Sequence, residues 1–195
     1  MLGTFSGMGI VLGSWLLSAS AKPMEVGAEL PAAKPMPQAQ GGEVSLGELK
    51  ADVLVLIVTC NECPVARAYE SRFVEFAKSQ TSQKGNVALV AINPYDRTGD
   101  TLEEMKVRVA EAGIPFPYVQ DKGQELTKAL GATKTPHVFV FDKNRKLAYH
   151  GAFDDNWADP TGVKKQYLVD VVTSLQAGKS VIPPTKPEGC SIHLD

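Results

Sequence analysis

The chain alternates between short apolar runs and longer stretches in which apolar residues recur every three or four positions. Residues 52–59 and 86–93 are continuous apolar runs rich in β-branched residues, a pattern typical of strands that are covered on both faces. Residues 65–80 instead carry apolar side chains at helical spacing. The order therefore predicts a strand–helix–strand unit at the start of the folded domain.

The second half of the chain continues the alternation of strands and helices. Thr101 and Glu104 fit a capping box and Gly113 fits a helix stop, so a helix is expected between them. The whole order predicts an α/β fold with a mixed central sheet and helices on both faces. The remaining expected elements are a short strand at 117–121, a helix at 123–132, a β-hairpin from 137–142 and 146–153, and a last helix at 163–179.

The first 41 residues differ from this domain pattern. Residues 7–21 are apolar and uncharged and end in Ala-Ser-Ala, which is the pattern of a secretory signal peptide, although no positive charge precedes them. The run is too short for a typical membrane-spanning helix. Residues 22–41 contain four prolines and no hydrophobic period. We therefore expect export to the periplasm or another extracytoplasmic space, with membrane attachment only if the first segment is uncleaved. The expected divisions are a signal peptide at 1–21, a flexible linker at 22–41 and a folded domain at 42–195.

Charge and cysteine content narrow the function. The 195 residues include 20 Lys and Arg against 22 Asp and Glu, without a basic run, so no nucleic-acid partner is expected. Three cysteines are too few for a disulfide scaffold and favour reactive thiols.

Two of these cysteines lie in "VTCNECPVA", residues 58–66. Cys60 ends an expected strand and Cys63 begins an expected helix, whose N-terminus favours a thiolate. In a C-x-x-C pair the first thiol is usually the more exposed. We therefore expect Cys60 to be the nucleophile and Cys63 to resolve the mixed disulfide, leaving a Cys60–Cys63 bridge. Two buried thiols that pack as small hydrophobic groups are the structural alternative.

Six segments together resemble the thioredoxin-like, peroxiredoxin-like group of the redoxin (AhpC/TSA-related) superfamily: "TCNECPVARAYE", "AINPYD", "PFPYVQD", "GATKTPHVFVFD", "LAYHGAFDDNW" and "TKPEGCSI". Thr135-Pro136 matches the cis-proline site that faces the redox pair in thioredoxins. The resemblance implies a thioredoxin-like fold and a thiol–disulfide oxidoreductase that needs no cofactor. Its partners would be protein or small-molecule thiols and disulfides, with a thiol electron donor.

Two departures from the related families bear on activity. Thioredoxins have Gly-Pro between the cysteines, whereas Glu62 here is expected to oppose a thiolate at Cys60. Peroxiredoxins have Thr-x-x-Cys. If Cys63 aligns with the cysteine of that pattern, Cys60 stands at the position of the threonine, and Thr59 lies one residue before it. An arginine near the peroxide is also needed, and Arg67 fits a solvated surface residue equally well. Thiol peroxidase is therefore kept as an alternative.

The third cysteine lies in the C-terminal segment "PEGCSIHLD". Cys190 is expected to be an accessory redox thiol or, alternatively, a tail cysteine without a role. With His193 and the other two cysteines it could complete a zinc site if the tail folds back. A non-catalytic metal- or thiol-binding module is thus a further alternative, although no metal is expected. His137, next to Pro136, is interpreted as a structural residue.

Overall fold

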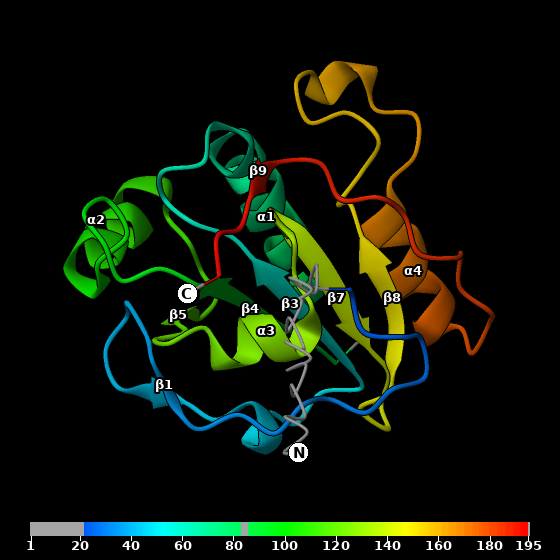
Figure 1. Ribbon diagram of the computed structural model, residues 1–195. Helices are drawn as coiled ribbons and strands as arrows, with labels where there is room; N and C mark the ends of the chain where they lie inside the picture. The colour runs from blue at the N-terminus through cyan, green and yellow to red at the C-terminus, as the bar shows by residue number, and fades with distance from the viewer. Residues whose placement is uncertain (1–21, 83–85, 195) are drawn as a thin grey trace, which may run out of the picture.

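A computed structural model describes residues 22–82 and 86–194 (Figure 1). The expected signal peptide lies outside the described residues. Within these residues, no helix combines the length and the apolar character needed to cross a membrane.

A five-stranded sheet organises the domain, in the order β5-β4-β3-β7-β8. Its first three strands are parallel to one another, whereas β7 is antiparallel to β3 and to β8. The predicted mixed sheet is therefore confirmed. The strands are β3 (Val53–Val58), β4 (Val87–Asn93), β5 (Tyr118–Gln120), β7 (His137–Phe141) and β8 (Leu147–Gly151).

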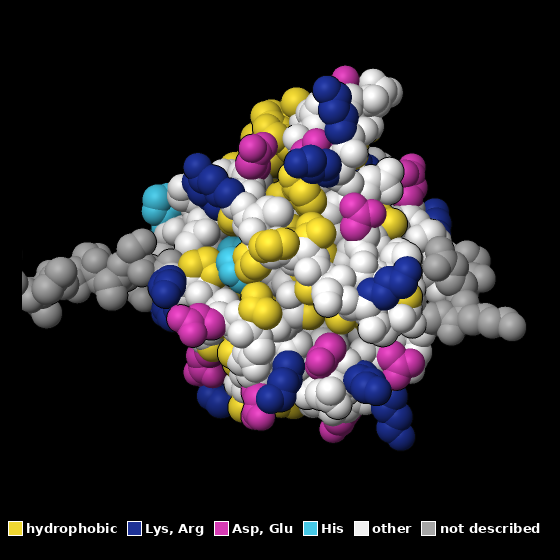
Figure 2. All heavy atoms as spheres, turned by 90° about the vertical axis from the view of Figure 1, so that its right-hand side faces the viewer, with side chains coloured by type: hydrophobic (Ala, Val, Ile, Leu, Met, Phe, Trp, Pro, Cys, Tyr) yellow, Lys and Arg dark blue, Asp and Glu magenta, His cyan; other side chains and the backbone are white. Residues whose placement is uncertain are grey.

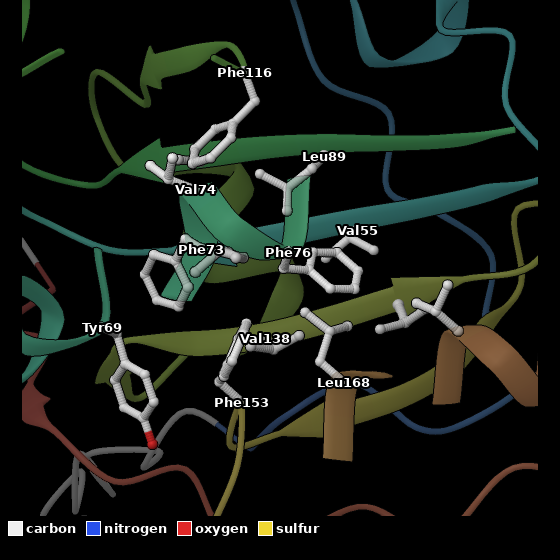
Figure 3. Packing of buried hydrophobic residues seen from close by; sticks show 14 of the residues in the cluster. Val55, Tyr69, Phe73, Val74, Phe76, Leu89, Phe116, Val138, Phe153 and Leu168 are labelled. Atoms are coloured by element: carbon white, nitrogen blue, oxygen red, sulfur yellow. The ribbon is translucent and has the colours of Figure 1, made fainter. Parts of the chain in front are cut away.

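Helices cover both faces of this sheet, as predicted. Because successive strand residues point to opposite faces, β3 contributes to two cores: Val55 belongs to one and Leu56 to the other. Figure 3 shows the first core, where aromatic rings of α1 lie against the sheet beside Leu168 of α4. The helices are α1 (Pro64–Ser82), α2 (Leu102–Ala112), α3 (Glu125–Leu130) and α4 (Tyr167–Gln176), with short 3-10 turns η1 (Leu46–Glu48) and η2 (Pro160–Gly162).

The local signals that bound α2 are confirmed. The Thr101 side chain accepts a hydrogen bond from the Glu104 amide, and the Glu104 carboxylate accepts one from the Thr101 amide. Gly113 ends the helix in the left-handed conformation that glycine adopts without steric cost.

The structure corrects the expectation of a poorly ordered linker at 22–41, which we call the N-terminal strap. Gly27 donates a backbone hydrogen bond of 2.7 Å to β8, and Ala39 donates one of 2.8 Å to β5. Met36 lies on the core and is 6% exposed. The strap also holds β1 (Met36–Pro37), which pairs with β2 (Glu43–Val44). A proline-rich sequence lacks periodicity, but its backbone groups still find partners on strands.

The chain after α4 returns across the domain and ends beside α3 (Figure 1). Its last part, residues 186–194, is called the C-terminal arm. It contains β9 (Cys190–Ser191), which pairs antiparallel with β6 (Lys134–Thr135). The arm thus brings the third cysteine to the strand that precedes Pro136.

On the face shown in Figure 2, charges of both signs are interspersed, and apolar side chains gather towards the centre.

Candidate thiol–disulfide site

Cys63 directly precedes α1, where unpaired amides face outward from the helix start. The Ala66 amide donates to Cys63 Sγ at 3.4 Å, and the Arg67 amide donates to the Cys63 carbonyl oxygen at 3.0 Å. These contacts place the sulfur of Cys63, rather than that of Cys60, at the positive end of the helix.

Cys63 forms a disulfide with Cys190, 127 residues later, with 6.0 Å between the two Cα atoms. The register of β6 and β9 places Cys190 opposite Thr135. The expected Cys60–Cys63 bridge is therefore not the one in this structure. Sequence spacing favours the nearby cysteine, whereas strand pairing brings the distant one into bonding range.

Cys60 is the free cysteine, and its burial corrects the expectation of an exposed nucleophile. Cys60 is 4% exposed, against 2% for Cys63, because other parts of the chain cover the site. Tyr95 belongs to the same buried cluster, and Cys190 and Ile192 of the arm pack against it. Both cysteines of the C-x-x-C segment are thus buried, as in the structural alternative, but they are not two thiols, because Cys63 is in a disulfide.

Thr135 contacts both sulfurs of the C-x-x-C segment. Cys60 Sγ donates to Thr135 Oγ1 at 3.5 Å, and the Thr135 carbonyl oxygen lies 3.0 Å from Cys63 Sγ. The peptide bond between Thr135 and Pro136 is cis, as predicted. The structure therefore brings together the five site residues expected from the sequence, which are Cys60, Cys63, Thr135, Pro136 and Cys190.

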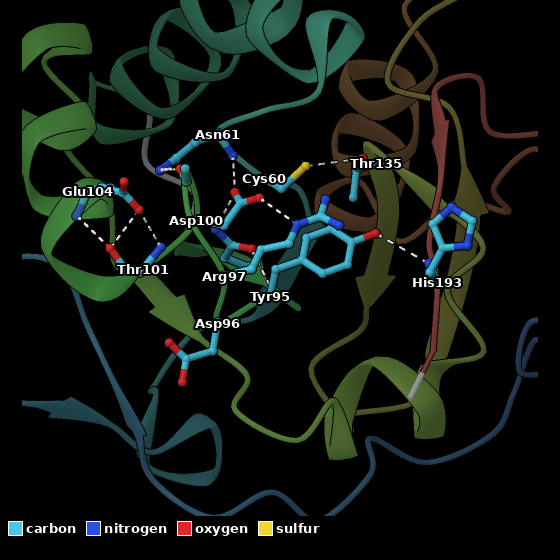
Figure 4. A network of polar contacts seen from close by, with 12 residues as sticks. Cys60, Asn61, Tyr95, Asp96, Arg97, Asp100, Thr101, Glu104, Thr135 and His193 are labelled. Carbon is cyan, nitrogen blue, oxygen red and sulfur yellow. Dashed lines mark hydrogen bonds and ion pairs between the residues drawn. The ribbon is translucent and has the colours of Figure 1, made fainter.

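A buried polar network fixes the loop that carries Cys60 (Figure 4). Asp100 Oδ1 accepts from the Asn61 amide at 2.7 Å and from Asn93 Nδ2 at 3.0 Å. The Tyr118 hydroxyl donates to Asn61 Oδ1 at 3.0 Å. Since the network joins the loop to β4 and β5, the position of Cys60 depends on residues far away in the sequence.

Burial is the main reason that the pKa of Cys60 is raised above its ordinary value of 9.0. The Thr135 hydroxyl opposes this pKa shift by hydrogen bonding to the sulfur, and Asp100 adds to it by charge repulsion. Glu62 is exposed, so the expectation that it would be the opposing acid was wrong; the buried Asp100 takes that role. Cys60 is thus held in its neutral form near neutral pH.

Two further residues at the site were missed by the sequence reasoning. Arg97 Nε lies 3.5 Å from Asp100 Oδ2, and its guanidinium stacks 3.8 Å from the centre of the Tyr95 ring. The Tyr95 hydroxyl in turn accepts from the His193 amide of the arm at 3.3 Å. The segment "AINPYD" includes Tyr95 and ends one residue before Arg97, but only the tertiary structure shows that Tyr95 packs in the buried cluster of the cysteines.

Other residues considered from the sequence have different surroundings. Arg67 is exposed. Burial lowers the pKa of His137 to about 3, which keeps it neutral near pH 7. Asp154, in the segment "LAYHGAFDDNW", is buried and paired with Arg72 at 2.6 Å. Among the described residues, no group of three or more His, Cys, Asp and Glu side chains is placed to hold a metal ion.

Residues 26–150 match the AhpC/TSA family. The chain belongs to the AhpC/TSA family. At a coarse level, this membership supports an oxidoreductase, and the disulfide beside the cis-proline agrees with that class. Among curated proteins, none matches the sequence.

Solved structures resemble this AhpC/TSA-family chain over most of its length. A hypothetical protein from Sinorhizobium meliloti is 30% identical, with a TM-score of 0.81 over 89% of this chain and 97% of the other. An uncharacterized conserved protein from Geobacillus kaustophilus is 32% identical, with a TM-score of 0.79 over 88% and 93%. The bacterioferritin comigratory protein of Xanthomonas campestris, at 16% identity and a TM-score of 0.59 over 79% and 99%, shares the fold alone.

Proposed function

We propose that this AhpC/TSA-family protein is a thiol–disulfide oxidoreductase in which Cys63 is the central sulfur. The observation that carries the proposal is the Cys63–Cys190 disulfide at the start of α1, with the free thiol of Cys60 in contact with the same residue, Thr135. A sulfur with two potential cysteine partners is suited to exchange, because each bond can be replaced by the other.

The surroundings of Cys63 support this role. In the reduced protein, the Ala66 amide and the helix N-terminus favour the Cys63 thiolate, the form that attacks disulfides. When Cys63 is protonated, the Thr135 carbonyl oxygen can accept its proton in a hydrogen bond. The Ala66 amide and the helix N-terminus also make Cys63 a good leaving group when an external thiol attacks its disulfide.

The reaction uses cysteine side chains alone, so the proposal requires no cofactor. Its partners are protein or small-molecule disulfides in one direction and dithiols in the other. Cys63 and one neighbouring cysteine hold the two electrons between half-reactions.

Reduction of a model disulfide by the reduced protein tests the proposal. We expect Cys63→Ser to lower the rate of complete reduction, in which both thiols of the model disulfide are released, at least about 100-fold, since both internal disulfides need this sulfur. Ser71→Ala, an exposed change on α1, is the matched control and should keep the wild-type rate. Wild-type rates in the Cys63→Ser variant would show that the proposal is wrong.

Thiol peroxidase is the second candidate, favoured by the family match and by the helix start beside Cys63. In that reaction peroxide would oxidise Cys63 to a sulfenic acid, which Cys190 or Cys60 would condense with. Two features argue for a slow reaction: Cys60 stands where peroxiredoxins have threonine, and Arg67 is exposed. Stopped-flow measurement of peroxide consumption distinguishes the candidates, because a rate well above that of disulfide reduction would favour the peroxidase.

Export is part of the proposal, because extracytoplasmic compartments allow disulfides to persist. The apolar segment ending in Ala-Ser-Ala supports it. We expect the native protein to begin at Lys22, and mass spectrometry of its N-terminal peptide is the measurement. An intact N-terminal Met1 in protein from the cytosol would contradict export.

A further inference from the structure

We propose that Cys190 is a shuttle thiol, carried on a tethered arm, which exchanges with external disulfides or dithiols and passes the oxidising equivalent to Cys63 and then to Cys60. This inference rests on the proposed function and assigns the entry point of that reaction. It reverses the order expected from the sequence, in which Cys60 meets the substrate.

The exposure of the three sulfur-bearing residues gives the first argument. Cys60 and Cys63 are both buried, whereas Cys190 is only partly buried. Thiol–disulfide exchange requires the attacking sulfur to reach the attacked one. In this state, an external thiol therefore has better access to Cys190 than to either cysteine of the C-x-x-C segment.

The attachment of the arm gives the second argument. Thr185, immediately before the arm, is fixed by three hydrogen bonds: its Oγ1 accepts from the Ala152 amide at 3.0 Å and lies 2.6 Å from the Tyr149 hydroxyl, and its amide donates to the His150 carbonyl oxygen at 3.1 Å. Tyr149 is itself buried. Thr185 is therefore a fixed point that does not depend on the disulfide.

Beyond Thr185, the contacts of the arm gather at β9 and its tip, where the His193 amide donates to the Tyr95 hydroxyl at 3.3 Å, Gln124 Nε2 donates to the His193 carbonyl oxygen at 3.1 Å, and Ile192 packs against two buried clusters. The Ile192 amide donates to the Thr133 carbonyl oxygen at 3.1 Å, and exposed Lys134 Nζ donates to Ser191 Oγ at 3.0 Å, beside the two-residue pairing of β9. Cys190 lies five positions after Thr185, so an undocked Cys190 can travel roughly 17 Å from its anchor. That reach allows the thiol to leave the site and return.

Gly189 adapts the arm for docking. A Cβ atom at this position would lie 2.1 Å from the Thr135 carbonyl oxygen. Glycine thus lets the arm approach the strand closely enough for Cys190 to reach Cys63. A side chain at this position should hinder docking without affecting the C-x-x-C segment itself.

Each step of the relay balances. In the reduced protein, the Cys190 thiolate attacks a partner disulfide, forming a mixed disulfide and releasing one partner thiol. The Cys63 thiolate then attacks Cys190 Sγ; the Cys63–Cys190 bond forms, and the second partner thiol leaves with the electron pair and a proton. Finally, the Cys60 thiolate attacks Cys63 Sγ and releases Cys190, which takes up the proton that Cys60 has lost. A dithiol partner drives the same steps in reverse.

Trapping with oxidised glutathione tests the entry point. The reduced Cys63→Ser variant is mixed with oxidised glutathione, quenched in acid, alkylated and mapped by mass spectrometry. Because the serine cannot resolve the mixed disulfide, bound glutathione stays attached to the protein. We expect Cys190 to be labelled at least ten times faster than Cys60, because Cys60 is buried. Faster labelling of Cys60 would overturn the inference.

Variants of the full-length protein separate this inference from the proposed function. Cys190→Ser should slow exchange with oxidised glutathione about ten-fold, and Gly189→Ala should slow it to a smaller degree. The double variant C190S/S191C keeps a thiol on the arm but moves it to the opposite side of β9, so it should not form the bond to Cys63. Lys186→Ala, on the exposed surface of the arm, is the matched control.

The outcomes are distinct. If the wild type exchanges and Cys190→Ser exchanges equally fast, the shuttle role is wrong while the proposed function stands. If the wild type does not exchange at all, the proposed function fails. Peptide mapping of the wild type in glutathione buffer should also show both the Cys63–Cys190 and the Cys60–Cys63 disulfides; only the first should form in Cys60→Ser. Absence of the second from the wild type would overturn the final step.

Discussion

The N-terminal strap and the C-terminal arm are both irregular segments that lie across strands of the domain, but they are held in different ways. The strap is held by backbone hydrogen bonds to two strands and, separately, by the burial of the Met36 side chain. The arm has a two-residue strand pairing, a few polar contacts and a disulfide to Cys63. Packing is permanent in the folded protein, whereas a disulfide depends on the redox state. The strap is therefore part of the fold, and the arm is suited to be part of the reaction.

Reduction of Cys63–Cys190 should separate the two segments most strongly. The bond closes a loop of 127 residues, so its loss should lower the free energy of unfolding by about 4 kcal/mol. Urea denaturation with and without reductant measures this change. Hydrogen exchange should show faster exchange in the arm and unchanged protection in the strap. An equal loss of amide protection in both segments would contradict the expected difference between them.

Truncation of the strap's buried side chain should have the next largest effect. Met36 is 6% exposed, and Met36→Ala should cost about 2–4 kcal/mol of unfolding free energy through lost burial and a cavity. Val26→Ala, at a position 51% exposed, is the control and should stay within about 0.5 kcal/mol. A similar small effect at both positions would mean that the strap contributes little to the fold.

The anchor of the arm should have a smaller effect on stability. Thr185→Val removes the hydroxyl that the Ala152 amide and Tyr149 contact, and should cost about 1–2 kcal/mol in thermal or urea denaturation. The same variant should make Cys63–Cys190 easier to reduce, because the arm loses its fixed point. An unchanged glutathione equilibrium would indicate that docking depends on β9 alone.

The smallest expected effect concerns the pH dependence of the thiol under the arm. Because the pKa of Cys60 is raised above 9.0, its thiolate fraction is small near pH 7 and increases as the pH rises through and beyond 9. Alkylation of Cys60 by iodoacetamide should follow that increase, and should be faster in the reduced protein, in which the arm is released.

Asp100→Asn tests the electrostatic part of this behaviour. Removing the negative charge should lower the pKa of Cys60, moving the alkylation profile to lower pH by less than about one unit. Glu62→Gln is the matched control at an exposed acid and should leave the profile in place. A larger shift in the control than in Asp100→Asn would restore the original expectation about Glu62.

Much of the fold follows from local sequence signals. The apolar run that forms β3 and the capping box of α2 each depend on neighbouring residues, whereas the cis-proline after Thr135 was expected from the resemblance to thioredoxins; the structure confirms all three. The strap was misjudged because its partners lie on strands that follow much later in the chain. Local patterns predict a segment's own conformation but not the distant backbone that it pairs with.

The sequence by itself determined the α/β class and the order of most elements, and it singled out the five residues that the structure brings together. The tertiary structure alone decided which cysteines bond, which thiol is free and buried, and which carboxylate lies beside it. The reason is physical: a cysteine's bond partner and pKa depend on distance and solvent access, and these are set by strand pairing and packing between residues far apart in the chain.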